Sequence, residues 1–140
     1  LDACLAKAIM SIGAVKAVEI GEGTEVSESR GSYNNDEFTM KDGKVSKSTN
    51  HAGGILGGMS DGSDIVLKAH FKPTPSIAST QNTVNKSGED IEVSIRGRHD
   101  PIIGPRAVVV VESMTALTIL DLLFENMSSR IDKIVEFYND

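Results

Sequence analysis

The feature that most restricts the fold of this chain is a glycine-rich run. Residues 49–59 read Thr-Asn-His-Ala-Gly-Gly-Ile-Leu-Gly-Gly-Met, with four glycines in six positions. Glycine loses more backbone entropy on folding than any other residue, so such a run needs a structural use. Two uses remain open: left-handed torsions in tight turns, or a flat ligand held against bare backbone. The run lacks the Lys-Ser/Thr ending of a P-loop and the spacing of a dinucleotide fingerprint.

Charged and metal-binding side chains restrict the possible functions. Twenty acidic against 14 basic residues give a net charge of −6, which disfavours a general binder of nucleic acid or anionic membranes. The single cysteine, Cys4, excludes an internal disulfide and a cysteine-based zinc site. His51, His70 and His99 have no His-x-x-x-His spacing, so we expect no metal site.

Positive charge is concentrated in the middle of the chain. Residues 68–106 carry six basic and four acidic side chains, whereas the parts on either side each carry four more acidic than basic ones. Within this stretch, residues 72–76 (Lys-Pro-Thr-Pro-Ser) offer a cation and two hydroxyls on a segment stiffened by prolines, and Arg98 offers a bidentate fork for phosphate or carboxylate. These residues predict a site for a flat, phosphorylated ligand. The alternative is a solvated basic surface on a strand that its two prolines end.

Hydrophobic periodicity and turn residues predict one α+β unit. We expect helices over 1–12, 105–127 and 131–138, and strands over 14–20, 38–40, 44–46, 64–71, 80–84 and 91–95. A chain of 140 residues has the size of one domain, which buries about two-thirds of its unfolded surface. Its apolar runs are shorter than a bilayer requires, and no basic-then-apolar signal segment opens it, so we expect a soluble protein of a reducing compartment.

Five motifs stand in order along the chain. They are Ala14-Val15-Lys16-Ala17-Val18-Glu19-Ile20-Gly21; Gly31-Ser32 with Asn35-Asp36 and Phe38; the glycine-rich run; Lys72-Pro73-Thr74-Pro75-Ser76; and Arg98-His99-Asp100-Pro101 followed by Pro105-Arg106-Ala107 and Glu112-Ser113-Met114. Together they resemble the C-terminal part of chorismate synthase. The resemblance covers residues 1–140 and implies that the N-terminal portion of the family's domain is absent. Gly13 stands where the family usually has Asn, and Ile102 where a small residue or Cys is usual.

The resemblance implies both a fold and a reaction. The implied fold is a β-α-β sandwich of antiparallel sheets packed on a layer of long helices, with helices 1–12 and 105–127 in that layer. The implied enzyme is an FMN-dependent carbon–oxygen lyase of the shikimate pathway, which makes chorismate for aromatic amino acid biosynthesis by 1,4-anti elimination of phosphate from 5-enolpyruvylshikimate 3-phosphate. The implied cofactor is reduced FMN, and NADPH is associated with the family. The implied assembly is a cytoplasmic homotetramer that binds neither nucleic acid nor membrane.

The resemblance also assigns roles to individual residues. Asp100 would lie near flavin N5 as the catalytic base, with His99 in a structural role. The implied cofactor-binding residues are Gly13, Ala14, Gly57, Lys72, Pro73, Thr74, Pro75, Ser76 and Arg98. Among them, Lys72 would be the cation and Ser76 a hydroxyl donor. We expect this chain to hold a half-site and to be inactive alone; the alternative is a non-catalytic folding or assembly unit that contributes a flavin half-site or a subunit interface.

Overall fold

The structure is a computed structural model that describes residues 1–139. Its helices are α1 (Asp2–Met10), the 3-10 helix η1 (Gly23–Ser27), α2 (Gly31–Asn34), α3 (Gly104–Ser128) and α4 (Ile131–Asn139). Its strands are β1 (Val15–Ile20), β2 (Phe38–Lys41), β3 (Lys44–Lys47), β4 (Ile55–Leu56), β5 (Met59–Ser60), β6 (Leu67–Phe71), β7 (Gln81–Val84) and β8 (Asp90–Val93). All four strand pairs are antiparallel. The predicted α+β class is confirmed.

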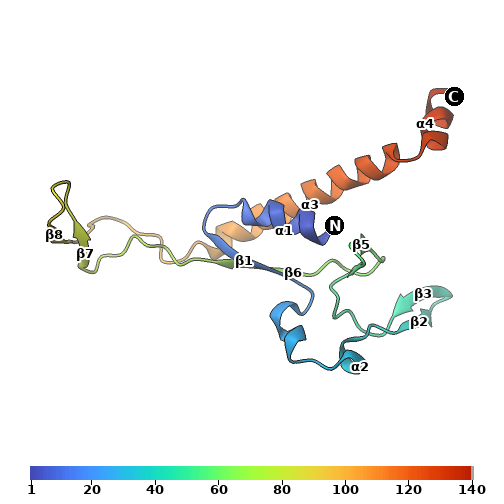
Figure 1. Ribbon diagram of the computed structural model, residues 1–140, viewed down its shortest axis with the longest axis horizontal. Helices are drawn as coiled ribbons and strands as arrows, with labels where there is room; N and C mark the ends of the chain where they lie inside the picture. Colours follow the sequence, from blue (N-terminus) through green and yellow to red (C-terminus); the bar gives the residue numbers. More distant parts are fainter. Residues whose placement is uncertain (140) are drawn as a thin grey trace.

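The body of the molecule is an antiparallel ribbon packed on helices. β1 pairs with β6 in a register that runs from Val15↔Phe71 to Ile20↔Leu67. α1 lies between this ribbon and the longer helix α3 (Figure 1). The buried side chains described are few and entirely apolar, namely Leu5, Ile9, Val15 and Ile55, and three glycines are buried with them: Gly21, Gly53 and Gly54. Of the predicted sandwich, residues 1–139 show this two-stranded antiparallel ribbon packed on α1, which in turn packs on α3.

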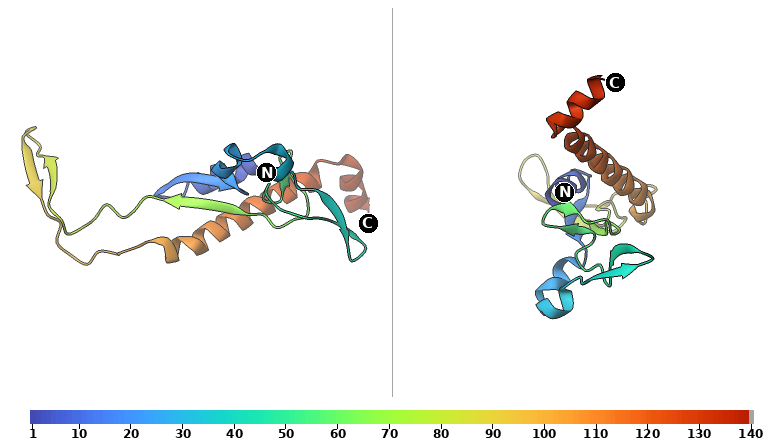
Figure 2. Two further views of the ribbon diagram at one scale, coloured as in Figure 1. Left: turned by 90° about the horizontal axis from the view of Figure 1, so that it is seen from below. Right: turned by 90° about the vertical axis from the view of Figure 1, so that its right-hand side faces the viewer.

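The rest of the chain extends from this body in several directions, with η1, α2 and the β2–β3 hairpin on the side of the ribbon away from α3 (Figure 1). The β7–β8 hairpin lies at the end of two extended segments, far from the body, and α4 lies at the opposite end of the molecule (Figure 2). The β2–β3 hairpin turns at Asp42 and Gly43, which both have positive φ (52° and 74°), as a two-residue hairpin turn requires. This hairpin and the long helix after Pro105 are confirmed; the β4–β5 hairpin within the glycine-rich run was not predicted.

The prediction of a domain that buries its own surface is wrong for this chain. The accessible surface is 10803 Å², whereas a compact protein of this size exposes about 7000 Å². α3 contributes to the excess, since none of its 25 residues is buried. A helix that is apolar on all sides needs cover on all sides, and α1 with the β1–β6 ribbon covers only one.

The expectation that no apolar stretch is long enough for a bilayer is also wrong. α3 has a mean hydropathy of 2.0 over its most apolar 18 residues, and by length and composition alone it could cross a membrane. The uninterrupted apolar runs in α3 are short, because Ser, Thr and a few charged residues lie between its apolar residues. The mean hydropathy over 18 residues is high all the same. The same composition is typical of the central helix of a larger soluble fold.

Candidate functional site

The glycine-rich run is folded mainly against other backbone. A Cβ at Gly53 (φ +65°) would lie 2.5 Å from the backbone nitrogen of Gly21, and one at Gly54 (φ +77°) would lie 2.5 Å from the carbonyl oxygen of Asp64. Gly57 and Gly58 form the two-residue turn between β4 and β5, and a Cβ at Gly57 would meet nothing within 4 Å. Tight turns and close backbone packing therefore account for Gly53 and Gly54, and only the hairpin turn leaves open space.

The Asp36 carboxylate organises the start of this run. It accepts hydrogen bonds from the Thr49 hydroxyl (2.7 Å), the His51 N–H (2.8 Å) and the Ala52 N–H (2.9 Å). Burial raises the pKa of Asp36, but these hydrogen bonds, with that from Ala52 foremost, outweigh it and hold the pKa below 3.8. The ionised form of the carboxylate is thus favoured. It holds the loop at 49–52, which lies 13 or more residues further along the sequence.

Two side-chain contacts to carboxylates flank the loop. The His51 Nδ1 atom contacts the Glu22 carboxylate, whose second oxygen accepts a 2.9 Å hydrogen bond from Asn34. The Lys47 ammonium contacts the Asp61 carboxylate, beside a polar hollow of about 460 Å³ lined by β3 and by the segments at 48–50 and 61–64. The sequence did not predict this network, since Glu22 and His51 lie 29 residues apart and carry no motif spacing.

Two of the predicted site segments meet where β6 ends. The Lys72 N–H donates to the Ala14 carbonyl at 2.7 Å. Ala14 has φ 71°, a left-handed conformation that costs an alanine about 1–2 kcal/mol. Strained backbone of this kind is concentrated at functional sites. A Cβ at Gly13, next to it, would meet nothing within 4 Å.

The segment after Lys72 is tied to the loop before α3. The Ser76 hydroxyl lies 2.7 Å from His99 Nδ1. The Thr74 hydroxyl is shielded from solvent and has no hydrogen-bond partner among residues 1–139. A buried hydroxyl in a folded protein is normally satisfied, so the Thr74 hydroxyl is an unsatisfied polar group at this position.

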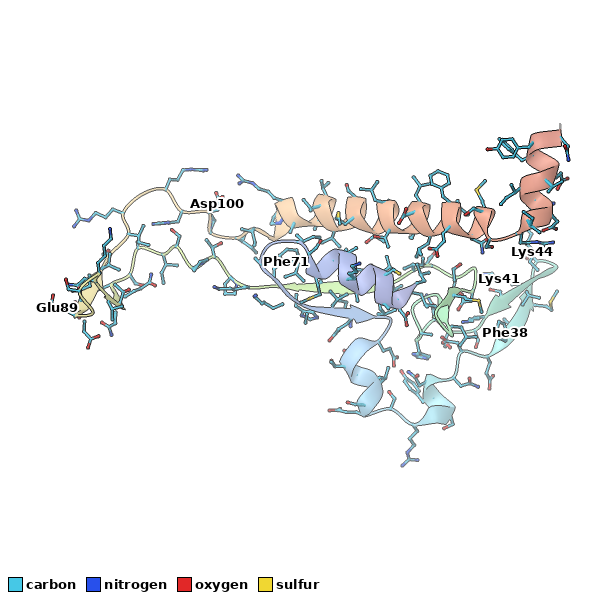
Figure 3. All side chains as sticks on the ribbon, turned by 45° about the horizontal axis from the view of Figure 1, so that its top comes forward. Phe38, Lys41, Lys44, Phe71, Glu89 and Asp100 are labelled. Atoms are coloured by element: carbon cyan, nitrogen blue, oxygen red, sulfur yellow. The ribbon has the colours of Figure 1, made fainter. Side chains whose placement is uncertain are left out.

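Asp100 lies between two arginines. Its carboxylate is 3.5 Å from Arg98 Nη2 and 3.0 Å from Arg106 Nη1. Asp100 and Phe71, the last residue of β6, lie toward the same end of the body (Figure 3). Between β6 and the first turns of α3 is an apolar hollow of about 300 Å³, lined by Ala69, Phe71, Gly104, Ala107, Val108, Val111 and Glu112. The apolar hollow is therefore bordered by the residue before segment 72–76 and by the start of the helix after the loop at 98–100.

The structure does not bring every predicted residue to this place. Gly58, next to Gly57, accepts a 2.6 Å hydrogen bond from the Leu1 nitrogen at the start of α1, whereas Gly13 and Ala14 follow the end of α1. The nine-residue helix separates these two points by about 14 Å. Within residues 1–139, the Lys72 ammonium has no carboxylate within ion-pair distance. Gly57 thus lies apart from the segments that carry Ala14, Lys72, Ser76 and Asp100.

Comparisons with known proteins agree on one family. The sequence model of that family, described as chorismate synthase, matches residues 1–124. The chorismate synthases of Lachnospira eligens and Agathobacter rectalis are 69% and 66% identical to this chain over 138 residues, which are 99% of this chain and 38% of each relative. That of Archaeoglobus fulgidus is 57% identical over 88% of this chain and 34% of its own length.

A solved structure gives the same answer for the fold. A crystal structure of chorismate synthase matches 99% of this chain and 34% of its own chain, with a TM-score of 0.69 and 29% sequence identity. This chain spans about 38% of the length of the curated relatives that it matches. The resemblance of the five motifs is confirmed, and we conclude that this chain belongs to the chorismate synthase family.

Proposed function

We propose that this chain is the C-terminal part of an enzyme that eliminates phosphate from 5-enolpyruvylshikimate 3-phosphate to give chorismate. One observation carries the proposal. Two hydrogen bonds, from the Lys72 N–H to the Ala14 carbonyl and between Ser76 and His99, join three segments far apart in sequence. These are the segments to which the family resemblance assigns flavin and substrate contacts.

The residues at this junction fit a flavin phosphate. The Thr74 hydroxyl is buried and without a partner among the described residues, so it is available to a polar atom of a ligand. The Arg98 guanidinium is 85% exposed, and the apolar hollow beside Phe71 offers a surface for a flat ring. Reduced FMN, when bound, would supply transient electron density to the substrate as its phosphate leaves.

The roles of the chain's own residues follow from their charge. Lys72 and Arg98 would hold the anionic groups of substrate and cofactor, concentrating positive charge locally in an acidic chain. Asp100 would take the proton from C6 of the substrate as the carbon–oxygen bond to phosphate breaks. Arg98 and Arg106, both within 3.5 Å of its carboxylate, would keep that carboxylate oriented. We further propose a cytoplasmic homotetramer, with α3 as a central helix of the complete fold.

Changing Asp100 to asparagine in the complete enzyme tests the catalytic role. We expect Asp100→Asn to lower kcat by about 10²- to 10⁴-fold, the range for loss of a general base, and to change the flavin Kd by less than about threefold. Chorismate formation and quenching of flavin fluorescence measure the two effects. Asp90→Asn, on the distant β8 strand, is the matched control and should change neither. Full activity of Asp100→Asn would refute the assignment.

Changing Gly13 to asparagine tests the flavin contact that this chain lacks. No atom lies within 4 Å of a Cβ at Gly13, and its φ is outside the left-handed region, so stability should change by no more than about 0.5 kcal/mol. One added hydrogen bond predicts a flavin affinity about fivefold higher. Gly31→Asn, where a Cβ also meets nothing within 4 Å, controls for a new amide elsewhere. Unchanged affinity for flavin in Gly13→Asn would argue against Gly13 as a cofactor residue.

The short span of the chain supports a further expectation, that the 140 residues alone form little or no chorismate with reduced FMN. The second candidate function, a non-catalytic assembly unit, is favoured by one observation: none of the most apolar 18 residues of α3 is buried. The two candidates differ in flavin binding by the complete protein. If flavin fluorescence is not quenched on titration while the particle keeps its size, the assembly role is supported and the flavin-dependent one fails.

A further inference from the structure

The His99 ring makes two contacts, and the one at Nε2 bears on the direction of the other, with Ser76. His99 Nε2 lies 3.1 Å from the carbonyl oxygen of Ile95. A carbonyl oxygen only accepts hydrogen bonds, so Nε2 carries the ring proton. In neutral imidazole the other nitrogen, Nδ1, then has only a lone pair to offer. Nδ1 lies 2.7 Å from the Ser76 oxygen, which therefore donates its proton to His99.

The charged groups nearby leave this assignment in place. Arg98 and Asp100 flank His99 in sequence, and Arg106 follows on α3, but the Asp100 carboxylate is held by the two arginines. Among the described residues no carboxylate forms an ion pair with the His99 ring. A ring that accepts from the hydroxyl at Nδ1 and donates to the carbonyl at Nε2 has both nitrogens satisfied.

We propose that His99 is a positioning residue that occupies the only proton of Ser76, so that Ser76 faces the ligand as an acceptor. A serine hydroxyl has one proton and two lone pairs. With the proton held by His99, the lone pairs are what remain for a ligand. The group that faces Ser76 is then an N–H or O–H donor, and it is neither a phosphate nor a carboxylate oxygen. This reverses the sequence-based expectation of Ser76 as a donor.

A second contact joins the same two segments and so helps to keep Ser76 beside His99. Ser76 and His99 lie on the two extended segments that lead to and from the β7–β8 hairpin (Figure 1). The Ser94 hydroxyl donates to the Ala78 carbonyl, at 3.1 Å, between the same two segments. Two side-chain hydrogen bonds therefore hold these segments together, and rotation of the Ser76 hydroxyl away from His99 would break one of them.

Nitrogen NMR of the complete protein tests the inference directly. With ¹⁵N-labelled histidine at neutral pH, we expect His99 to show the neutral form protonated at Nε2. In Ser76→Ala the Nδ1 resonance should move toward that of a nitrogen without a hydrogen bond, whereas Ser79→Ala, an exposed serine of the same segment, should leave it unchanged. A ring protonated at Nδ1, or on both nitrogens, would overturn the proposal.

Flavin binding tests whether the ligand group that contacts Ser76 is a hydrogen-bond donor. This experiment rests on the function proposed above. We expect Ser76→Ala to weaken FMN and riboflavin equally, by about tenfold, because a donor on the ring system is present in both. A loss seen with FMN but not with riboflavin, which lacks the phosphate, would contradict the acceptor role. An unchanged affinity for both would contradict it as well. If the unaltered protein binds neither flavin, the proposed function fails, and the nitrogen spectrum still decides the direction of the hydrogen bond.

Discussion

Gly53→Ala should unfold the body of this protein, whereas Gly57→Ala should not. Both glycines have left-handed φ, at +65° and +59°. At Gly53 the added Cβ meets rigid backbone, 2.5 Å from the Gly21 nitrogen and 2.8 Å from the Val66 carbonyl oxygen. We expect a loss of more than about 4 kcal/mol in the free energy of unfolding, which is exceptional for one methyl group.

Gly57 is the matched control because it shares the torsion but not the surroundings. No atom lies within 4 Å of a Cβ there, so Gly57→Ala should cost only the torsional strain of about 1–2 kcal/mol. Urea unfolding of the complete polypeptide measures both losses. Equal losses at the two positions would show that torsion, and not close backbone contact, explains the glycines.

Lys47→Met should produce the second large effect. The Lys47 and Asp61 side chains are 4% and 8% exposed, so their ion pair is shielded from water. Removing the ammonium leaves a shielded carboxylate without its counter-charge, which is much more costly than breaking an exposed pair. The urea midpoint should fall several times further than in Lys44→Met, at an exposed lysine of the same strand. Adding Asp61→Asn to Lys47→Met should recover most of the loss.

The same ion pair predicts how stability depends on pH. The hydrogen bond from Lys47, followed by those from Ser63, lowers the pKa of Asp61 from 3.8 to about 2. Since the folded pKa lies below the unfolded one, the ionised carboxylate stabilises the fold above pH 3.8. This contribution is lost as the pH falls from 3.8 to about 2. Asp61→Asn should flatten the unfolding profile in that window; an unchanged profile would contradict the assignment.

Local signals in the sequence were sufficient for most of the elements. Leu5 and Ile9, spaced for one face of a helix, are the two fully buried side chains, and Pro105 lies in the first turn of α3. The β4–β5 hairpin was missed because its two-residue Gly57-Gly58 turn stands inside a longer run of glycines. The prediction that the chain buries most of its own surface was wrong because α3 is apolar around its whole circumference. The other described elements cover only one side of it.

The site was predictable only in part. The family resemblance selected Lys72, Ser76 and Asp100 as candidate site residues. Their contacts depend on pairs such as Ser76–His99, which are 23 positions apart. Asp36 belongs to the second of the five motifs, but its distance in sequence from residues 49–52 gave no sign that its carboxylate would bind that loop. The assigned roles of Asp100 and of the cofactor residues stay predictions until they are tested by mutation.

The bare surface of α3 also has a consequence for biogenesis. Its 25 residues include eight exposed large apolar side chains, among them Val109, Leu117 and Phe124. A nascent polypeptide that exposes such a helix before the neighbouring elements have packed on it is prone to aggregate with other copies. Chaperone demand during synthesis should therefore centre on this helix.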